Sequence, residues 1–252
     1  MGTPSLLILT ATISPPSGVP NLRRVNPSLR RLDYLEALSI YLRLPNEVAD
    51  RIVFLENSGS DLSDLQELAK KEGQGKTVEF ISFEGLDYPP EYGRAFGEFK
   101  MLDYGFMHST LLQALGENDC FWKMTGRLKV FNLKQLIETA PPAYKLLMDF
   151  SRKPTQMVDL RLFSCSRVGY RHLFEGAYTA FREDLQKMSV EGYLYLQWVG
   201  KLGELGIVPR HRLQPKIGGV GGQHNVDYLG GINIAKYWIR VAARRFVPGL
   251  WI

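Results

Sequence analysis

The sequence has little cysteine and no long apolar run. Its 252 residues include two cysteines, Cys120 and Cys165, both in apolar segments, which favours buried thiols in a reducing compartment over a disulfide. No apolar stretch approaches the roughly 20 residues of a transmembrane helix. Leu6 to Leu9 is too short for a secretory signal and lacks a basic region before it. We expect a cytoplasmic protein, either free or peripheral on the cytosolic face of a membrane.

Two glycine motifs that bind nucleotides are also missing. The chain has neither the G-x-G-x-x-G of dinucleotide enzymes nor the G-x-x-x-x-G-K-[ST] of phosphate-loop enzymes. The composition, 45% apolar and 23% charged, is that of a globular protein, and the length suits a single domain. A net charge of +5 fits nucleic acid, phosphorylated ligands or an anionic membrane, and does not choose among them.

Short apolar runs alternate with helical spacing along the first half of the chain. Leu6 to Ile13 is typical of a central parallel strand, Arg51 to Leu55 of a second buried strand, and Thr77 to Phe83 of a strand nearer an edge. Leu32 to Leu44 has helical spacing between the first two. This order predicts an open α/β sheet, mainly parallel and flanked by helices.

Polar side chains follow these strands where they end. Another aromatic strand, beginning at Cys120, runs into Lys123-Met124-Thr125-Gly126-Arg127. In open α/β sheets ligands bind beyond the carboxyl ends of the strands, and two cations with a hydroxyl and a glycine suit a phosphate. A turn with solvated cations is the alternative. The candidate ligand-binding residues at the strand ends are Thr12, Glu56, Asn57, Ser58, Lys123, Thr125, Gly126 and Arg127.

A glycine-containing segment opens a further predicted helix. Tyr92 to Phe99 contains Arg94, Gly97 and Glu98, so that backbone N–H groups and a cation would face an anion at the helix N-terminus. Glu98 would equally serve as a first-turn residue favoured by the helix dipole. Arg31, from the arginines after the proline-rich loop, completes the predicted donor-binding set.

The order of these motifs resembles nucleotide-sugar-dependent glycosyltransferases of the GT-A type, particularly small bacterial and viral enzymes that build polysaccharides. The motifs are Glu56-Asn57-Ser58-Gly59, Gly93 to Glu98 and Asn118 to Arg127, within a resemblance covering roughly residues 5 to 230. It implies a Rossmann-like single domain over 1–230, with a donor half over about 1–135 and an acceptor half over about 136–230. It also implies a hexosyl- or pentosyltransferase with a nucleotide-sugar donor and a glycan or lipid-linked acceptor.

The sequence departs from this family at one point. Typical members carry Asp-x-Asp after the glycine-containing helix, where it holds a divalent metal, whereas this chain has Lys123 to Arg127 there and no Asp-x-Asp elsewhere. In the family the metal neutralises the leaving diphosphate. Lys123 and Arg127, with Arg94, would do so by charge-assisted hydrogen bonds. We therefore predict a metal-independent enzyme with no cofactor.

Two carboxylates are candidates for the acceptor side. Glu191 follows the predicted cap Ser189, and the resemblance implies that an acidic residue at such a helix start is the general base of an inverting transfer. The alternative is a glutamate favoured by the helix dipole, and without a base a retaining route is favoured. Asp159 lies with Arg161 on one face of a predicted strand, either in the acceptor pocket or as a structural ion pair.

Three later segments complete the predictions. Residues 133–150, interrupted by Pro141-Pro142, and residues 170–188 have helical spacing. The glycine-rich segment 215–228 is either a flap over the site, with His224 contacting the diphosphate or acceptor, or a flexible connector.

The C-terminal segment 231–252 is predicted to form a basic amphipathic helix. Lys236, Arg240 and Arg244 form one stripe, and Ile232, Ile239 and others form the opposite one. Residues 232–251 would either lie on an anionic membrane or pack on the core with a solvated basic face.

Two other functions remain open from the sequence. One is a sialyltransferase-like enzyme with a CMP-sugar donor, which also needs no metal. The other is a basic nucleic-acid-binding module. Because the arginines are dispersed among strand ends, we expect no nucleic-acid partner.

Overall fold

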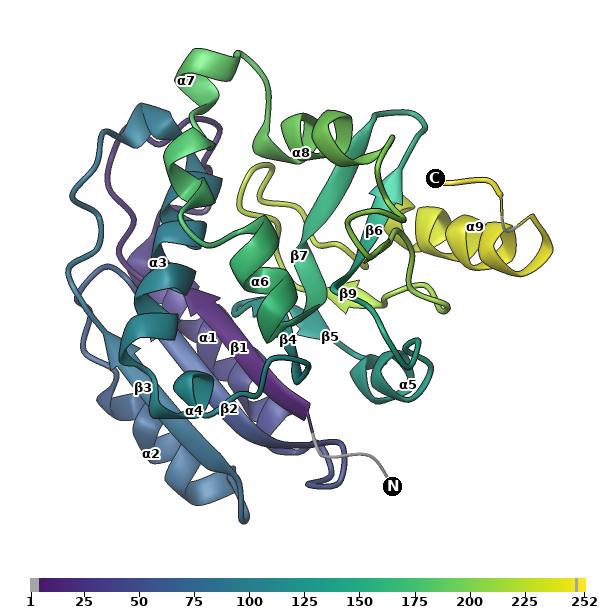
Figure 1. The fold of residues 1–252 in the computed structure, drawn as a ribbon. Helices are drawn as coiled ribbons and strands as arrows, with labels where there is room; N and C mark the ends of the chain where they lie inside the picture. Colours follow the sequence, from purple (N-terminus) through teal and green to yellow (C-terminus); the bar gives the residue numbers. More distant parts are fainter. Residues whose placement is uncertain (1–4, 248) are drawn as a thin grey trace.

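The computed structural model describes residues 5–247 and 249–252 and is built on a seven-stranded sheet (Figure 1). The strand order is β3-β2-β1-β4-β7-β6-β8. Strands β1 to β4 run parallel, whereas β7 is antiparallel to both β4 and β6. The predicted mixed, mainly parallel α/β sheet is confirmed, with β3 at an edge. The strands are β1 (Ser5–Ala11), β2 (Ala49–Glu56), β3 (Thr77–Ser82), β4 (Cys120–Thr125), β6 (Leu146–Ser151), β7 (Met157–Ser166) and β8 (Ile207–Val208), with β5 (Lys129–Val130) and β9 (Ile217–Gly218) paired separately.

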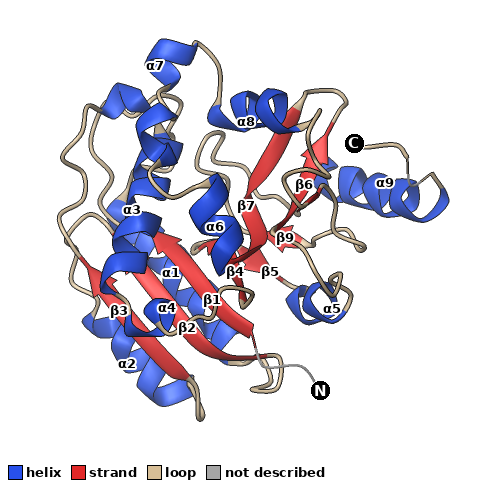
Figure 2. Ribbon diagram, viewed as in Figure 1, coloured by secondary structure: helices blue, strands red, loops and turns tan. Residues whose placement is uncertain are grey.

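Helices cover both faces of the sheet (Figure 2). One apolar core joins the sheet to α1, α2 and α5, and a second joins it to α3, α4, α6 and α8. The helices are α1 (Pro27–Leu42), α2 (Ser63–Glu72), α3 (Arg94–His108), α4 (Thr110–Gln113), α5 (Leu133–Glu138), α6 (Arg167–Leu173), α7 (Glu183–Gln186), α8 (Val190–Trp198) and α9 (Ile232–Phe246), with the 3₁₀ turns η1 (Pro90–Tyr92) and η2 (Ala177–Ala180).

The first strand and helix form as the sequence predicts. Every residue of β1 from Leu6 to Ala11 is buried, because neighbours lie on both sides and helices cover both faces. The side chain of Asn26 caps α1 by accepting a hydrogen bond from the Leu29 N–H, which satisfies a backbone donor left free at the helix start. These elements hold the carboxyl end of β1 at the centre of the molecule.

Two predictions of helix are wrong. The second half of 133–150 forms strand β6, because Pro141-Pro142 ends the helical stretch and the apolar run beyond it is of strand length. The segment 170–188 breaks into the end of α6, η2 and α7. Gly176, with a φ of 73°, separates the first two, since that backbone conformation is incompatible with a continuing helix.

Both cysteines are free thiols. Among the described residues no helix combines the length and apolar character needed to cross a bilayer.

Candidate functional site

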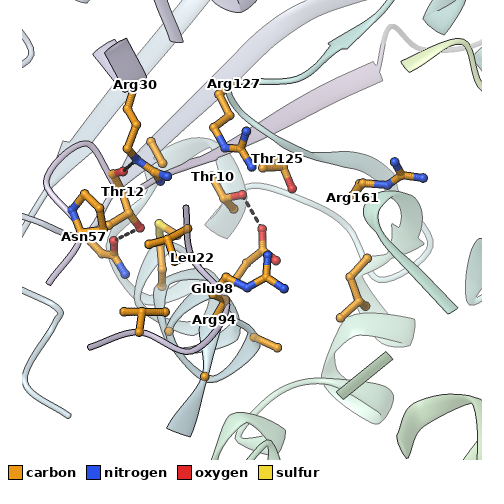
Figure 3. A pocket seen from close by; sticks show the side chains of 18 of the residues that line it. Thr10, Thr12, Leu22, Arg30, Asn57, Arg94, Glu98, Thr125, Arg127 and Arg161 are labelled. Carbon is orange, nitrogen blue, oxygen red and sulfur yellow. Dashed lines mark hydrogen bonds between the residues drawn. The ribbon is translucent and has the colours of Figure 1, made fainter. Parts of the chain in front are cut away.

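A cavity lies where β1 and β4 end and α3 begins (Figure 3). Its walls come from segments far apart in the sequence, including the loops after β1 and β2 and the helices α7 and α8. This is the position at which open α/β sheets bind ligands. Of the residues predicted from the sequence, the cavity brings together Thr12, Asn57, Arg94, Gly97, Glu98, Thr125, Arg127 and Glu191.

Two buried arginines form one wall of the cavity. Arg127 is 7% exposed and donates to the Val220 carbonyl, while Arg30 donates to the carbonyls of Thr12 and Arg24 at 2.7 and 3.0 Å. Neither guanidinium forms an ion pair with a carboxylate in the described part of the chain. Burial lowers the pKa of Arg127, and the nearby charge of Arg30 lowers it further. Two buried cations held only by neutral oxygens favour an anionic ligand.

Arg30 was not among the predicted site residues, and its neighbour Arg31 was. Arg31 lies on the other side of α1, where it donates to Asp64 at 2.7 Å and to the Asp61 carbonyl, away from the cavity. The buried face of α1 contains Tyr34 and Leu38. Arg30 precedes Tyr34 by four residues and so shares that face. This spacing is visible in the sequence and could have indicated that Arg30, rather than Arg31, is buried.

The N-terminus of α3 forms the opposite wall. Gly93 precedes it with a φ of 91°, a conformation that glycine adopts without strain, and Arg94 is the first helical residue. A Cβ at Gly97 would lie 1.8 Å from the Tyr88 hydroxyl, so glycine lets this tyrosine side chain lie directly against the helix. The first turn of α3 thus presents backbone N–H groups and a cation to the cavity.

Glu98 lies on the cavity wall beside Arg94 (Figure 3). Its Oε1 accepts a hydrogen bond from Thr10 at 2.7 Å and pairs with the ammonium of Lys123 at 2.5 Å. Lys123 is fully buried, donates to the Leu160 carbonyl at 2.7 Å, and does not line the cavity. The prediction that Lys123 contacts the diphosphate is therefore corrected: on a strand covered by α3 its side chain points between the layers, where it holds Glu98.

Arg161 enters the cavity from β7. Both oxygens of Asp159 bind its guanidinium, at 2.8 and 2.6 Å, and its charge lies 4.6 Å from the centre of the Tyr228 ring. Burial raises the pKa of Asp159, but the charge of Arg161 and the hydrogen bonds from Arg161 together outweigh burial, so the pKa of Asp159 is lowered. Asp159 does not line the cavity. Of the two alternatives expected for Asp159, the structural ion pair is present, and Asp159 is the counter-ion of Arg161 rather than part of the cavity lining.

Two glutamates line the cavity from α7 and α8. Ser189 caps α8 by accepting the Gly192 N–H, as predicted, and Glu191 stands in its first turn. Glu183 packs against Gly93. Burial raises the pKa of Glu183, and the Glu191 carboxylate raises it further against the opposing charge of Arg94. Glu183 was missed because its segment was predicted as one continuous helix.

Glu56, Ser58 and His224 lie outside the cavity lining, in contrast to their predicted role. Glu56 is fully buried and accepts the backbone N–H groups of Ile13 and Ser58, so it fixes the loops after β1 and β2. Ser58 donates its hydroxyl to Glu56. His224 is exposed.

Two glycine positions support the arginine wall. The Gly126 N–H donates to the Thr10 carbonyl at 2.8 Å, and a Cβ on Gly126 would lie 2.9 Å from that oxygen. A Cβ on Gly222, in the glycine-rich segment, would meet the guanidinium of Arg127 at 2.7 Å. Part of the predicted flap is thus packed behind Arg127.

The described residues offer no preformed cluster of ligands for a divalent metal at this site. In the described chain no group of three or more His, Cys, Asp and Glu side chains is placed to hold one. The cavity carboxylate nearest the strand ends, Glu98, is already bound by Thr10 and Lys123. Divalent cations bound with nucleotides take oxygen ligands, some of them from the phosphates themselves, and after β4 the cavity presents the guanidinium of Arg127 instead.

No protein-family model and no curated protein matches the sequence. The structure is similar to the glycosyltransferase GlyE of Streptococcus pneumoniae TIGR4, with a TM-score of 0.50 at 9% identity, over 82% of this chain and 45% of that one. The fold is of the GT-A type. The chain spans less than half the length of GlyE.

Two further structures are similar to this GT-A fold. The galactosyltransferase LgtC, solved with donor and acceptor sugar analogs, has a TM-score of 0.48 at 13% identity, over 82% of this chain and 74% of that one. The inositol-1-phosphate CTP transferase from T. maritima has a TM-score of 0.48 at 11% identity, over 96% and 97% of the two chains.

Proposed function

We propose that the protein is a glycosyltransferase that moves a sugar from a nucleoside-diphosphate donor to a glycan or lipid-linked acceptor, as in polysaccharide synthesis. The observation that carries the proposal is the wall formed by Arg30 and Arg127, two buried cations without a carboxylate partner at the strand ends of a GT-A fold. A diphosphate carries the negative charge that would balance these two guanidinium groups. Its oxygens can also accept the paired hydrogen bonds that a guanidinium donates.

The donor nucleotide would occupy the side of the cavity formed by the loops after β1 and β2. Thr12 donates its hydroxyl to Asn57 Oδ1 at 2.6 Å, which fixes the Asn57 amide and orients its N–H₂ group as a donor for the ribose or base. The diphosphate would then lie between the arginine wall and the first turn of α3, where Arg94 stands. The helix N-terminus adds its dipole to the same anion.

Transfer then requires charge stabilisation on one side and proton removal on the other. The acceptor oxygen attacks the anomeric carbon, and the bond from that carbon to the diphosphate breaks with its electron pair going to the diphosphate. Arg30, Arg94 and Arg127 stabilise the charge that develops there, in the role that a divalent metal has in other enzymes. Glu191 lines the cavity from α8 and takes the acceptor proton, which gives inversion.

A thermal-shift screen against UDP, GDP, CDP, dTDP and CMP tests this function, each nucleotide with EDTA and with Mn²⁺. A ligand that binds only the folded state at 100 times its dissociation constant stabilises it by about 2.7 kcal/mol. We expect a shift with one diphosphate in EDTA. Sugar transfer from a nucleotide sugar with the same base should be retained in EDTA. In Glu191→Gln the transfer should be lost, while the thermal shift produced by the diphosphate remains.

Each other outcome of the screen has a definite meaning. A shift that requires Mn²⁺ contradicts the metal-free site. A shift with CMP alone identifies a CMP-sugar donor instead. The absence of any shift contradicts nucleotide-sugar transfer altogether.

A further inference from the structure

The outer face of α9 is apolar. Its most exposed side chains are Ile232 at 72%, Trp238 at 59%, Ile239 at 60% and Phe246 at 74%. Ile232, Ile239 and Phe246 are seven residues apart in turn, so they follow one another along a single face of the helix. Four large apolar side chains in one exposed stripe mark an interaction surface, because isolated exposed apolar residues are common but contiguous ones are not.

The inner face of α9 fixes the direction in which this stripe points. Arg244 forms an ion pair with Asp149, donates to Gln214 Oε1 at 2.8 Å and binds the His211 carbonyl. Ala243 beside it is buried. A buried guanidinium with three partners is costly to withdraw, so the helix does not rotate to hide its apolar face. The expectation of an outward stripe containing Arg244 is thus corrected: Arg244 anchors the helix to the body.

The exposed charges that flank the apolar stripe are cationic. Lys236 and Arg245 are both exposed on α9. From residue 228 to residue 252 the sequence contains no Asp or Glu. An acid-free segment with outward cations is complementary to a negatively charged surface.

We propose that α9 lies flat on an anionic membrane, with the stripe of Ile232, Trp238, Ile239 and Phe246 inserted at the boundary between headgroups and acyl chains. An amphipathic helix with aromatic and aliphatic side chains on one face and cations beside them binds membranes in this way. Lys236 and Arg245 contact the anionic headgroups. The helix begins four residues after Tyr228, which lines the cavity, so the cavity would be held close to the bilayer.

A second copy of the chain fits this face less well. In a two-fold symmetric dimer the same patch meets itself, so the cations of one α9 would lie near the cations of the other with no acidic residue of the segment to pair with them. The membrane satisfies both the apolar side chains and the charges.

Flotation with lipid vesicles tests the proposal without any substrate, so its outcome is independent of the proposed sugar transfer. The purified chain is mixed with vesicles of phosphatidylglycerol and phosphatidylcholine, or of phosphatidylcholine alone. We expect it to float with the anionic vesicles and to dissociate at high salt. Trp238→Ser/Ile239→Ser should bind at least about tenfold more weakly, because it removes two of the large apolar side chains whose burial in the bilayer stabilises the bound state.

Matched variants distinguish vesicle binding by the α9 face from non-specific binding by exposed apolar side chains elsewhere. Met107 and Leu196 are similarly exposed, on α3 and α8, and Met107→Ser/Leu196→Ser should bind vesicles as the unchanged chain does. Equal loss in both double variants, or no flotation with anionic vesicles, overturns the proposal. So does a dimer in solution that Trp238→Ser/Ile239→Ser abolishes, because it identifies a second copy as the occupant.

Discussion

Arg30 and Arg127 hold their charges inside the protein on carbonyl and hydroxyl oxygens alone. Lys123, on β4 and four residues before Arg127, instead has a carboxylate partner in Glu98. The difference separates two roles: a cation with a counter-ion is already satisfied, whereas a cation without one lowers the free energy of a bound anion. At the scale of single residues, the two arginines are therefore suited to binding an anion, whereas Lys123 positions Glu98.

Replacing Lys123 tests the positioning role. Lys123→Met leaves the Glu98 carboxylate without its counter-ion, and we expect a loss of roughly 3 kcal/mol in the free energy of unfolding, at the lower end for a broken buried pair because Glu98 is 20% exposed. Urea denaturation measures it. The double variant Lys123→Met/Glu98→Gln should recover most of the loss, and an equal loss in both variants would contradict the pairing.

Glu183 should make the stability depend on pH. Its pKa is raised above the ordinary value of 4.5, so between that value and the raised one the folded state binds more protons than the unfolded state. The contribution of Glu183 to stability is therefore lost as the pH rises through this window. Relative to the unchanged chain, Glu183→Gln should gain stability with increasing pH, measured as urea midpoints over that range.

Asp184 provides the contrast for this measurement. A hydrogen bond from Arg182 lowers the pKa of Asp184, so the stabilisation is present at higher pH and is lost as the pH falls. Asp184→Asn should thus show the opposite trend to Glu183→Gln. The same trend in both variants would show that the shift of Glu183 does not arise from its own surroundings.

At the scale of elements, the turn between β4 and β5 brings the arginine wall against the end of β1. Gly126 makes this possible, because its N–H binds the Thr10 carbonyl at a distance that leaves no room for a Cβ. The contact is between backbones, so no side-chain rotation relieves a clash there.

Gly126→Ala should lower the free energy of unfolding by about 1–3 kcal/mol, the usual cost of overpacking. Gly200 is the matched control, since a Cβ there meets nothing within 4 Å, and Gly200→Ala should be neutral or slightly stabilising. Thermal or urea unfolding compares the two. Equal stability of both variants would show that the β4–β5 turn is not held against Thr10.

At the scale of the whole molecule, the alternation of strands and helices was predictable as far as β4. There, strands alternate with helices, and local signals such as the Asn26 cap mark where a helix begins. The second half of the chain was harder to predict, because the short apolar run that forms β6 fits a helix and a strand equally well. Three short helical pieces replace the continuous helix expected at 170–188.

The candidate site was predictable in position and only partly in its residues. The strand-end rule placed Thr12, Asn57 and Arg127 correctly at the cavity. It placed Glu56 and Lys123 there too, because sequence order does not show whether a side chain at a strand end turns to the cavity or between the layers. Glu183 could not be assigned to the cavity from the sequence, because its position depends on the path of the chain through α7.

The central claim is that arginines bind a nucleoside diphosphate without a metal, and calorimetric titration in EDTA tests it most directly. The titrant is the diphosphate selected by the nucleotide screen. Arg94→Ala and Arg127→Met should each bind at least about tenfold more weakly, because a hydrogen bond to a charged group contributes about 1.5–3 kcal/mol. Arg94 is exposed at a helix start, so Arg94→Ala stays folded, and the exposed Lys201→Ala should bind as the unchanged chain does. Binding that requires Mn²⁺, or equal affinity in all three variants, would contradict the account.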